Sequence, residues 1–327
     1  MLHLSTSTPT PSSNNGCRLP IALFHRDFRS YTGGHGKVWD YFNHIRQSGL
    51  YQARIFFTHQ SVFDQTNPWK DCQDVIVKTW KPGEADLFFL AGMDWQALPE
   101  AFSQDKPIIN LIQGVRHADP NLPLYHFLSR HAIRICVSEP VADAILATGQ
   151  VNGPVFVIPN GIETLAPLLE RERCGTLFID AVKNRQTGIK LAQELQTLGY
   201  TVQLLAEKLP RADYLTLLAR ARLAILLPTP VEGFYLPGLE AMALGVPVVM
   251  TDCIGNRQYA NHNENCLIVP SSKIVNTIRG VGKDTLHRLQ IAGLKTAKQY
   301  TLEQERDRFF SILFQLANYS KSRKAKF

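Results

Sequence analysis

The sequence predicts an α/β protein with two Rossmann-like, doubly wound domains that face a central cleft. Short apolar runs alternate with helical patterns, and this alternation occurs twice, on either side of a polar stretch at residues 162–173. The apolar runs are continuous, which is typical of parallel strands covered on both faces. The chain has 327 residues, which is more than a single domain of about 100–200 residues holds. Two strand–helix repeats in one chain therefore indicate two layered α/β domains.

The expected strands follow these apolar runs in chain order. In the first half they cover residues 20–25, 54–58, 74–77, 86–92, 107–113, 133–138 and 155–161, with a helix over 37–47. In the second half they cover residues 175–182, 201–207, 223–228, 246–252 and 266–270, with helices over 187–198 and 211–221. The amphipathic segment 301–319 is expected to be part of a C-terminal helix that crosses back to the first domain.

These elements divide the chain into four parts. They are a disordered lead-in at residues 1–17, a first domain at 18–162, a second domain at 163–304, and a C-terminal helix with a basic tail at 305–327. The lead-in is rich in Ser, Thr, Pro and Asn, and such a composition cannot bury enough apolar surface to fold.

The composition excludes several classes of protein. Hydrophobic residues make up 45% of the chain and charged residues 19%, as in ordinary soluble globular proteins. No apolar run approaches the roughly 20 residues that span a bilayer, and the N-terminus lacks the pattern of a secretory signal. The cysteines are scattered without a Cys-x-x-Cys pair. This indicates reduced thiols in the cytoplasm and no cysteine-bound metal.

The charge balance is moderately basic, with a formal net charge of +7. Part of this excess lies in the tail KSRKAKF, residues 321–327. Such a tail is either a solvated terminus or a contact to an anionic membrane surface, to which each basic residue contributes about 1 kcal/mol. Elsewhere the basic residues are dispersed, so nucleic acid is not an expected partner.

The segment EGFYLPGLEAMALG, residues 232–245, has the properties of a binding site. Glu232 lies in the loop after an expected strand, and Pro237 stands where a helix can begin. The carboxylate of Glu240 offers two acceptor oxygens, which suit the vicinal hydroxyls of a ribose. Backbone N–H groups from Gly233 onward provide a place for an anion between the two acids. Ribose, diphosphate and sugar together outline a nucleotide sugar.

At these residues the sequence resembles a known family. The stretch EGFYLPGLEAMALGVPVVMTD, residues 232–252, is similar to the E-x7-E signature of GT-B-fold glycosyltransferases of the retaining family 4 type. VIPNGIE at residues 157–163 is similar to that family's interdomain segment, and SYTGGHGK at residues 30–37 is similar to its glycine-rich loop. The resemblance covers nearly the whole chain past residue 18. It implies the GT-B fold, with an acceptor-binding first domain and a donor-binding second domain.

The resemblance implies roles for the residues of the E-x7-E segment. The second acid, Glu240, is expected to bind the donor ribose, and the first acid, Glu232, is expected to contact the donor sugar and to act in catalysis. The residues that follow Glu232 are expected to line the donor: Gly233, Phe234, Tyr235 and Leu236. Tyr235 replaces a glycine that is common in the family and would narrow the space near the donor sugar.

The first domain also contributes candidates by this resemblance. Gly33 and Gly34 are expected to approach the donor diphosphate through their backbone, or else to form only a flexible loop. His117, beside Arg116, is the closest match to the family's donor-contacting histidine and is a candidate catalytic residue. The alternative for His117 is a ring that is hydrogen-bonded to a loop carbonyl.

Cations are expected to neutralise the departing diphosphate. The sequence contains no Asp-x-Asp pair, so no metal cofactor is expected, and preorganised cations and N–H groups can provide the same stabilisation. In the segment DAVKNRQTG, residues 180–188, the family's Gly-Arg pair is missing. Lys183 and Arg185 are the candidates that remain, Lys183 also for catalysis, and the sequence leaves the choice between them open.

The expected activity is the transfer of a sugar from a nucleotide sugar to a glycan or lipid-linked acceptor, with retention of anomeric configuration. First-domain loops at residues 27–31, 67–69 and 92–94 would hold the acceptor. The protein would act in the cytoplasm, or at the inner face of the membrane. Two alternatives stay open: a catalytically silent subunit that binds nucleotide sugars, and a nucleotide-sugar epimerase of the same architecture, which would need further acid/base carboxylates.

Overall fold

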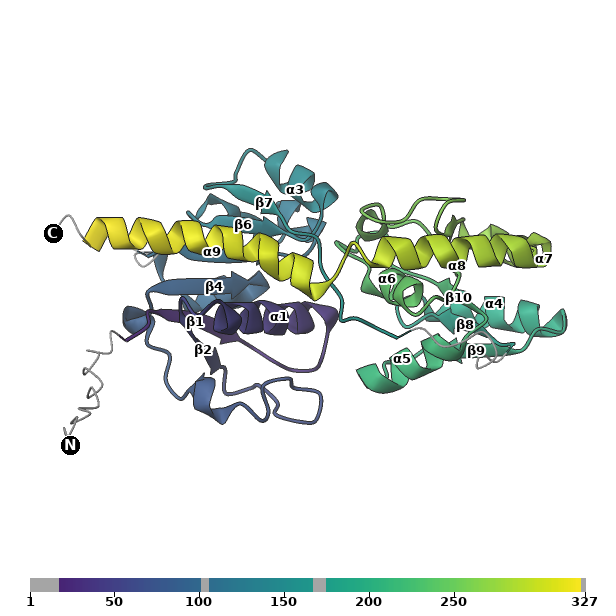
Figure 1. Ribbon diagram of the computed structural model, residues 1–327, viewed down its shortest axis with the longest axis horizontal. Helices are drawn as coiled ribbons and strands as arrows, with labels where there is room; N and C mark the ends of the chain where they lie inside the picture. The colour runs from purple at the N-terminus through teal and green to yellow at the C-terminus, as the bar shows by residue number, and fades with distance from the viewer. Residues whose placement is uncertain (1–17, 101–105, 167–174, 325–327) are drawn as a thin grey trace, which may run out of the picture.

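The computed structural model describes residues 18–100, 106–166 and 175–324. The expected disordered lead-in and the last three residues of the basic tail lie outside these ranges. Within them the chain forms two parallel β-sheets flanked by helices (Figure 1). The predicted pair of doubly wound α/β domains is therefore confirmed. No helix of the described part is long and apolar enough to cross a membrane.

The first sheet is seven-stranded and parallel, in the order β3-β2-β1-β4-β5-β6-β7. Its strands are β1 (Ile21–Arg26), β2 (Gln52–Phe57), β3 (Ile76–Val77), β4 (Leu87–Ala91), β5 (Ile108–Ile112), β6 (Ile133–Cys136) and β7 (Val155–Val157). The α-helices of this domain are α1 (Gly33–Ser48), α2 (Pro123–His126) and α3 (Glu139–Leu146). Strands β4 and β5 are buried along their whole length, as their continuous apolar runs predict.

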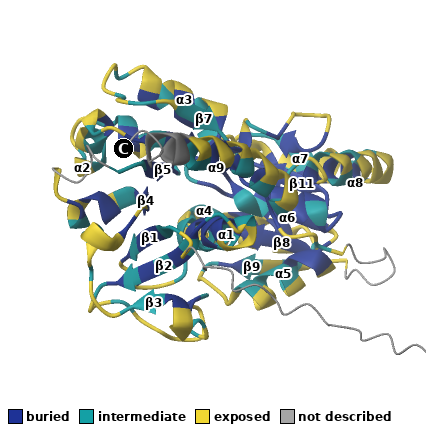
Figure 2. Ribbon diagram, turned by 60° about the vertical axis from the view of Figure 1, so that its left-hand side comes forward, coloured by how far each residue is buried: buried dark blue, intermediate teal, exposed yellow. Residues whose placement is uncertain are grey.

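The second sheet is five-stranded and parallel, in the order β12-β11-β10-β8-β9. Its strands are β8 (Leu177–Asp180), β9 (Val202–Leu205), β10 (Leu223–Leu226), β11 (Val248–Met250) and β12 (Leu267–Ile268). The helices are α4 (Arg185–Thr197), α5 (Arg211–Arg220), α6 (Leu236–Ala243), α7 (Ile274–Gly280) and α8 (Lys283–Ala297). Figure 2 shows the strands of both sheets as largely buried and the outward faces of the helices as exposed.

The C-terminal helix α9 (Leu302–Lys324) runs back across the first domain and contacts α1 (Figure 1). It begins directly beside the interdomain segment, where Ile162 and Thr301 form an isolated β-bridge. The expectation of a helix that crosses back is confirmed. The crossing gives the two domains a second covalent connection in addition to the segment after β7.

A buried cluster of charges fastens this crossing helix. Glu305 of α9 forms an ion pair with Lys37 (2.5 Å) and a hydrogen bond with the ring of His44 (3.1 Å), both on α1. Lys37 Nζ also contacts Asp40 at 2.8 Å and donates to the carbonyl of Gly161 at 3.1 Å. The N–H of Gly161 in turn donates to Glu305 at 2.5 Å. The cluster therefore ties α1, α9 and the interdomain segment to one another.

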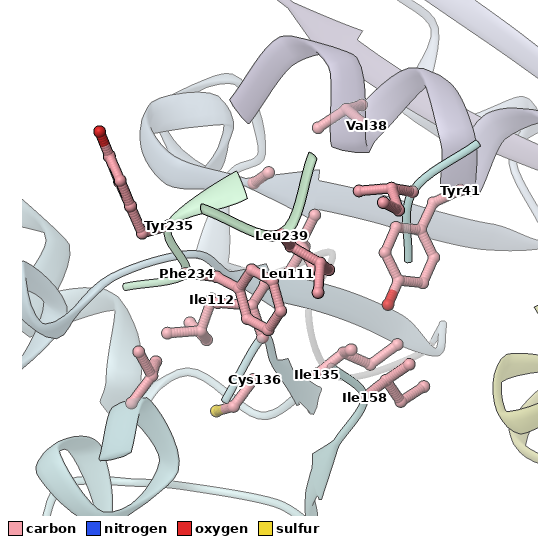
Figure 3. Packing of buried hydrophobic residues seen from close by; sticks show 14 of the residues in the cluster. Val38, Tyr41, Leu111, Ile112, Ile135, Cys136, Ile158, Phe234, Tyr235 and Leu239 are labelled. Atoms are coloured by element: carbon pink, nitrogen blue, oxygen red, sulfur yellow. The ribbon is translucent and has the colours of Figure 1, made fainter. Parts of the chain in front are cut away.

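The apolar core continues across the domain boundary. Phe234 and Leu239 of the second domain belong to the same cluster of buried hydrophobic residues as Ile112 and Cys136 of the first. Figure 3 shows the Phe234 and Leu239 side chains among those of Ile112, Cys136 and Ile135. The two domains are thus packed against each other at the start of α6.

Candidate active site

The candidate site lies at the carboxyl edge of the second sheet, where the strand order reverses. Strands β8 and β10 are hydrogen-bonded neighbours, but the chain leaves β8 toward β9 and leaves β10 toward β11, on opposite sides. Ligands of open α/β sheets bind in the crevice at such a switch point. The loop after β8 carries Lys183, and the loop after β10 carries Glu232.

The first pair of charged groups at this edge is Lys183 and Glu232. Lys183 Nζ is hydrogen-bonded to Glu232 Oε1, which also accepts from Thr229 Oγ1 at 2.8 Å. The Lys183 side chain is 47% exposed and the Glu232 side chain 19%. An ion pair that reaches solvent contributes only about 0–1 kcal/mol. An anionic ligand can therefore replace Glu232 as the partner of Lys183 at a small cost in free energy.

The second pair is more deeply placed. Glu240 is the fifth residue of α6, its side chain is only 3% exposed, and its Oε1 lies 2.6 Å from Arg211 Nη1. Arg211 is the first residue of α5, and its side chain is 34% exposed. A buried carboxylate needs such a counter-charge, because an unpaired buried ion is strongly unfavourable. Proline stands in the first turn of α6, as the sequence predicts.

Asp180, the last residue of β8, adds a third acid to this edge. It is buried, and it accepts hydrogen bonds from the N–H of Val182 at 3.2 Å and from the hydroxyl of Tyr214 at 3.4 Å. Burial raises the pKa of its carboxyl, against the opposing effects of these hydrogen bonds and of Lys183. Glu232, Glu240 and Asp180 thus all belong to elements that meet at the switch point.

The glycine pair of the first domain is part of a helix rather than of a loop. Helix α1 begins at Gly33, four residues before the predicted start, because Thr32 caps it by accepting from the N–H of His35 at 3.2 Å. A Cβ atom added at Gly33 would lie 3.6 Å from Leu236 in the second domain. The N-terminus of α1 therefore faces α6, and free N–H groups at a helix start favour anions.

The backbones of the two domains meet at Gly233. A Cβ atom added at this residue would lie 2.2 Å from the carbonyl oxygen of Gln113. The carbonyl of Gly233 accepts from Ser138 Oγ at 2.9 Å, and the side chain of Gln113 donates to the carbonyl of Gly34 at 3.3 Å. Only glycine allows this approach. Gln113 thereby links the start of α1 to the loop that carries Glu232.

Of the residues that follow Gly233, some are buried in the core and one lies beside the start of α1. The ring of Phe234 packs against Tyr259 and Tyr300, with ring centroids 5.7 and 6.1 Å apart. The ring is buried and packs in the core. The side chain of Tyr235 points away from Phe234 and Leu239 in Figure 3 and is itself buried. Leu236 is half-buried beside Gly33.

The histidine candidate is buried in the short helix that follows β5. His117 lies in the 3-10 turn Val115–Ala118. This turn directly follows Gly114, which packs on Gly233. Within the described residues the Nδ1 atom of His117 has no hydrogen-bond partner. Burial, together with the charges of Arg134 and Arg116, lowers the pKa of His117 to about 4. The ring is therefore neutral at physiological pH, while Arg116 beside it is exposed.

Some of the residues that the sequence predicts for the site have side chains that do not reach this edge of the sheet. Arg185 is exposed and pairs with Glu207 at 3.4 Å instead of with an acid of the site. In the expected acceptor loops, Trp69 is fully buried, and Asp94 is buried with its carboxylate bonded to Arg26. Of the segments at 27–31, 67–69 and 92–94, the first retains the exposed charged side chains, including Asp27.

Sequence reasoning missed four residues of the site: Arg211, Asp180, Gln113 and Thr229. Arg211 and Gln113 contact residues of other elements, and no local pattern marks such a contact. Thr229 bonds to Glu232 within the same loop. The position of Asp180 at a strand end, one residue beyond the apolar run LFI, was the one available signal. Among the described residues there is no group of three or more His, Cys, Asp or Glu side chains that suits a metal ion.

Comparison with known proteins finds a family match in the second domain. Residues 162–283, most of the second domain, match the family described as glycosyl transferases group 1. The match includes the segments that carry Lys183, Glu232 and Glu240. No curated protein sequence matches it significantly.

Solved structures resemble this chain in fold. HepE from Anabaena in complex with UDP has a TM-score of 0.71 at 13% identity, over 90% of this chain and 100% of that one. Sucrose-phosphate synthase from Thermosynechococcus elongatus has a TM-score of 0.64 at 14% identity, covering 91% and 99%. The lipopolysaccharide outer core galactosyltransferase WaaB has a TM-score of 0.63 at 13% identity, covering 93% and 100%. The architecture is therefore the expected GT-B fold.

Proposed function

We propose that this protein is a glycosyltransferase that moves a sugar from a nucleoside diphosphate sugar to a hydroxyl of a glycan or lipid-linked acceptor, with retention and without a metal. The observation that carries the proposal is the pairing of two acids with two basic groups at one switch point. Lys183 is bonded to Glu232, and Arg211 is bonded to Glu240. Acids suit the hydroxyls of ribose and sugar, and cations suit a diphosphate between them.

The donor binds along this edge in a definite order. Glu240 accepts from the ribose hydroxyls, while Lys183 and the N–H groups of Gly33 and Gly34 contact the diphosphate. Glu232, with Gly233 and Leu236, contacts the sugar. UDP sugars are the first donors to test, because the similar HepE structures contain UDP or UDP-glucose.

The reaction then proceeds on one face of the sugar. The bond between the anomeric carbon and the phosphate oxygen breaks, and the acceptor oxygen forms a bond to the same carbon from the same side. The acceptor proton passes to the leaving phosphate oxygen, so no protein nucleophile is needed. Lys183 stabilises the charge that develops on the diphosphate. His117, neutral because its pKa is about 4, contributes a hydrogen bond to the sugar rather than a charge.

The acceptor and the place of action follow from the first domain and the tail. Segment 27–31 presents exposed Asp27 and Arg29 to an acceptor beside the start of α1. The nucleotide sugar and the free thiols of Cys72, Cys136 and Cys253 suit the cytoplasm. The basic stretch at residues 321–327 suits a peripheral contact with the inner face of a membrane.

A donor screen tests this proposal. Purified protein is incubated with UDP, GDP and ADP sugars, each with and without EDTA, and release of the nucleoside diphosphate and thermal stabilisation are measured. We expect one base and sugar to be hydrolysed slowly and to stabilise the fold, with no loss on chelation. Stabilisation without release over long incubation identifies a silent binding subunit, and appearance of an epimeric nucleotide sugar identifies an epimerase. A loss of activity in EDTA that Mg²⁺ restores contradicts the metal-free mechanism.

A further inference from the structure

The ion pair of Arg211 with Glu240 is asymmetric. Its two atoms, Arg211 Nη1 and Glu240 Oε1, lie 2.6 Å apart. The carboxylate end is enclosed in α6, at 3% side-chain exposure, whereas the guanidinium end at the start of α5 keeps 34%. The acid is therefore held in place by its surroundings, and the arginine joins it from the solvent side.

Both side chains of the pair can form further hydrogen bonds. A carboxylate accepts about four hydrogen bonds, and Arg211 uses one oxygen of Glu240. A guanidinium has several N–H donors in a fixed planar fork, and its carboxylate bonds are strongly directional. An arginine in this position fixes the rotation of the carboxylate, and thereby the direction in which the carboxylate accepts hydrogen bonds from hydroxyls.

The pair also faces the first domain. Burial raises the pKa of Tyr31, and the charges of Arg211 and Glu240 act on the same phenol in opposite directions. Tyr31 precedes α1 and packs on its first turn, where a Cβ atom added at Gly36 would lie 2.6 Å from the phenol oxygen. The Arg211–Glu240 pair is therefore close to the start of α1, where the proposed function places the diphosphate.

We propose that Arg211 is a positioning residue for ribose recognition: it orients the Glu240 carboxylate so that the free oxygen accepts from the 2′- and 3′-hydroxyls of the donor nucleotide. This inference rests on the proposed function, because it takes Glu240 as the ribose acceptor. Arg211 acts through Glu240, and its removal leaves the diphosphate and base contacts in place. Its loss is thus felt only by ligands that carry the ribose hydroxyls.

A comparison of ribo and deoxyribo ligands tests this inference. Among UDP, GDP and ADP, the nucleoside diphosphate that binds tightest to the wild type is titrated calorimetrically beside its 2′-deoxy counterpart. We expect the wild type to favour the ribo form by about tenfold to a hundredfold, the range of one charge-assisted hydrogen bond. Arg211→Ala and Glu240→Gln should each bring this ratio to within about threefold of unity, because they weaken the ribo form more than the 2′-deoxy form, which keeps only the 3′-hydroxyl. Arg211→Lys should restore part of the ratio.

The controls separate positioning from general damage. Arg257, an exposed arginine of the same domain that pairs with Asp252 at 2.6 Å, provides a matched variant, and Arg257→Ala should keep the wild-type ratio. The double variant Arg211→Ala/Glu240→Gln should bind no worse than Glu240→Gln, since the two residues act as one unit. If Arg211→Ala does not fold, Arg211→Lys and Arg211→Gln provide the same ratio.

The possible outcomes are distinct. If Arg211 variants weaken both ligands equally, or leave the ratio at its wild-type value, the positioning role is overturned while nucleotide binding stands. If the wild type binds the ribo and 2′-deoxy forms equally, Glu240 is not the ribose acceptor and the inference fails in the same way. If the wild type binds none of the three nucleoside diphosphates, the proposed function itself fails.

Discussion

The two acids of the E-x7-E segment differ in their surroundings, and this difference separates their roles. Glu240 is buried and holds its arginine in a fixed geometry, whereas Glu232 is more exposed and bonds to a lysine that reaches solvent. A buried and oriented acceptor suits ground-state binding of a rigid diol. An acceptor near the reacting sugar matters more as positive charge develops on the ring, which is a transition-state effect.

Single substitutions of the two acids test this separation. We expect Glu240→Ala to weaken binding of the nucleoside diphosphate by about tenfold to a hundredfold, because it removes charge-assisted bonds to ribose. Glu232→Ala should lower turnover and leave that binding intact or slightly tighter, since it releases Lys183 from its ion pair. Calorimetry with the free nucleotide and initial rates with the donor measure the two effects. Wild-type nucleotide binding by Glu240→Ala would show that the roles are assigned wrongly.

A second residue-scale prediction decides between the two candidate cations. The structure favours Lys183, which is bonded to Glu232, over Arg185, which is paired with Glu207 at the surface. Lys183→Ala should weaken diphosphate binding and also slow turnover, by about tenfold or more in each, because the ligand is charged in the ground state and gains charge on leaving. Arg185→Ala should have the smaller effect on both. The reverse order in a side-by-side titration assigns the diphosphate to Arg185.

At the scale of elements, the buried charges between α1 and α9 hold the crossing helix. Lys37, Glu305 and His44 are all buried, so the contacts among them must offset the free energy lost when these groups leave water. Burial alone would raise the pKa of Glu305, but Lys37 and His44 outweigh it, and the net effect lowers that pKa below its ordinary value of 4.5. The carboxylate therefore contributes stability above pH 4.5, and this contribution is lost as the pH falls through the lowered pKa.

The lowered pKa of Glu305 predicts how the substitution Glu305→Gln changes stability with pH. At pH 7 the variant leaves a buried lysine with only Asp40 and should lose about 3–5 kcal/mol of unfolding free energy. The difference from wild type should shrink as the pH falls below 4.5, because protonated Glu305 resembles glutamine. Urea denaturation of both proteins at pH 7 and at several lower pH values down to about 2.5 measures this. A difference that stays constant over that range would mean that the ionised carboxylate is not what stabilises the crossing.

At the scale of the whole molecule, closure of the cleft depends on bare backbone contacts. The carbonyl of Gln113 approaches Gly233 so closely that a Cβ atom there would lie 2.2 Å away. Ser138 and the apolar side chain of Phe234 complete this contact. Closure over a donor excludes water and assembles groups from both domains.

Gly233→Ala should therefore uncouple donor binding from turnover. Nucleoside diphosphate affinity should change little, because its main contacts lie in the second domain, while the transfer rate falls by about tenfold or more as closure is blocked. Small-angle scattering should show compaction with saturating ligand in the wild type but not in the variant. Gly280→Ala provides the control, since no atom lies within 4 Å of a Cβ added there. Equal compaction of the two variants would count against Gly233 as the closing contact.

The sequence predicts the strands and their parallel character well, because buried strands such as β4 and β5 leave continuous apolar runs. It misplaces the start of α1, since glycine is a poor helix former and the Thr32 cap outweighs that preference. It reveals Glu240 but not its partner Arg211. The two are 29 residues apart on different helices, and their contact arises only from the packing of α5 beside α6.

The most direct test of the central claim is hydrogen exchange with and without a saturating nucleoside diphosphate, because it locates the donor on the chain. The account predicts slowed exchange in peptides that cover residues 181–188 and 229–240, with a smaller effect at 33–37 in the first domain. These segments meet at the edge formed by β8, β10 and the start of α1. Protection confined to other segments, or no protection at a ligand concentration that saturates binding, would contradict it.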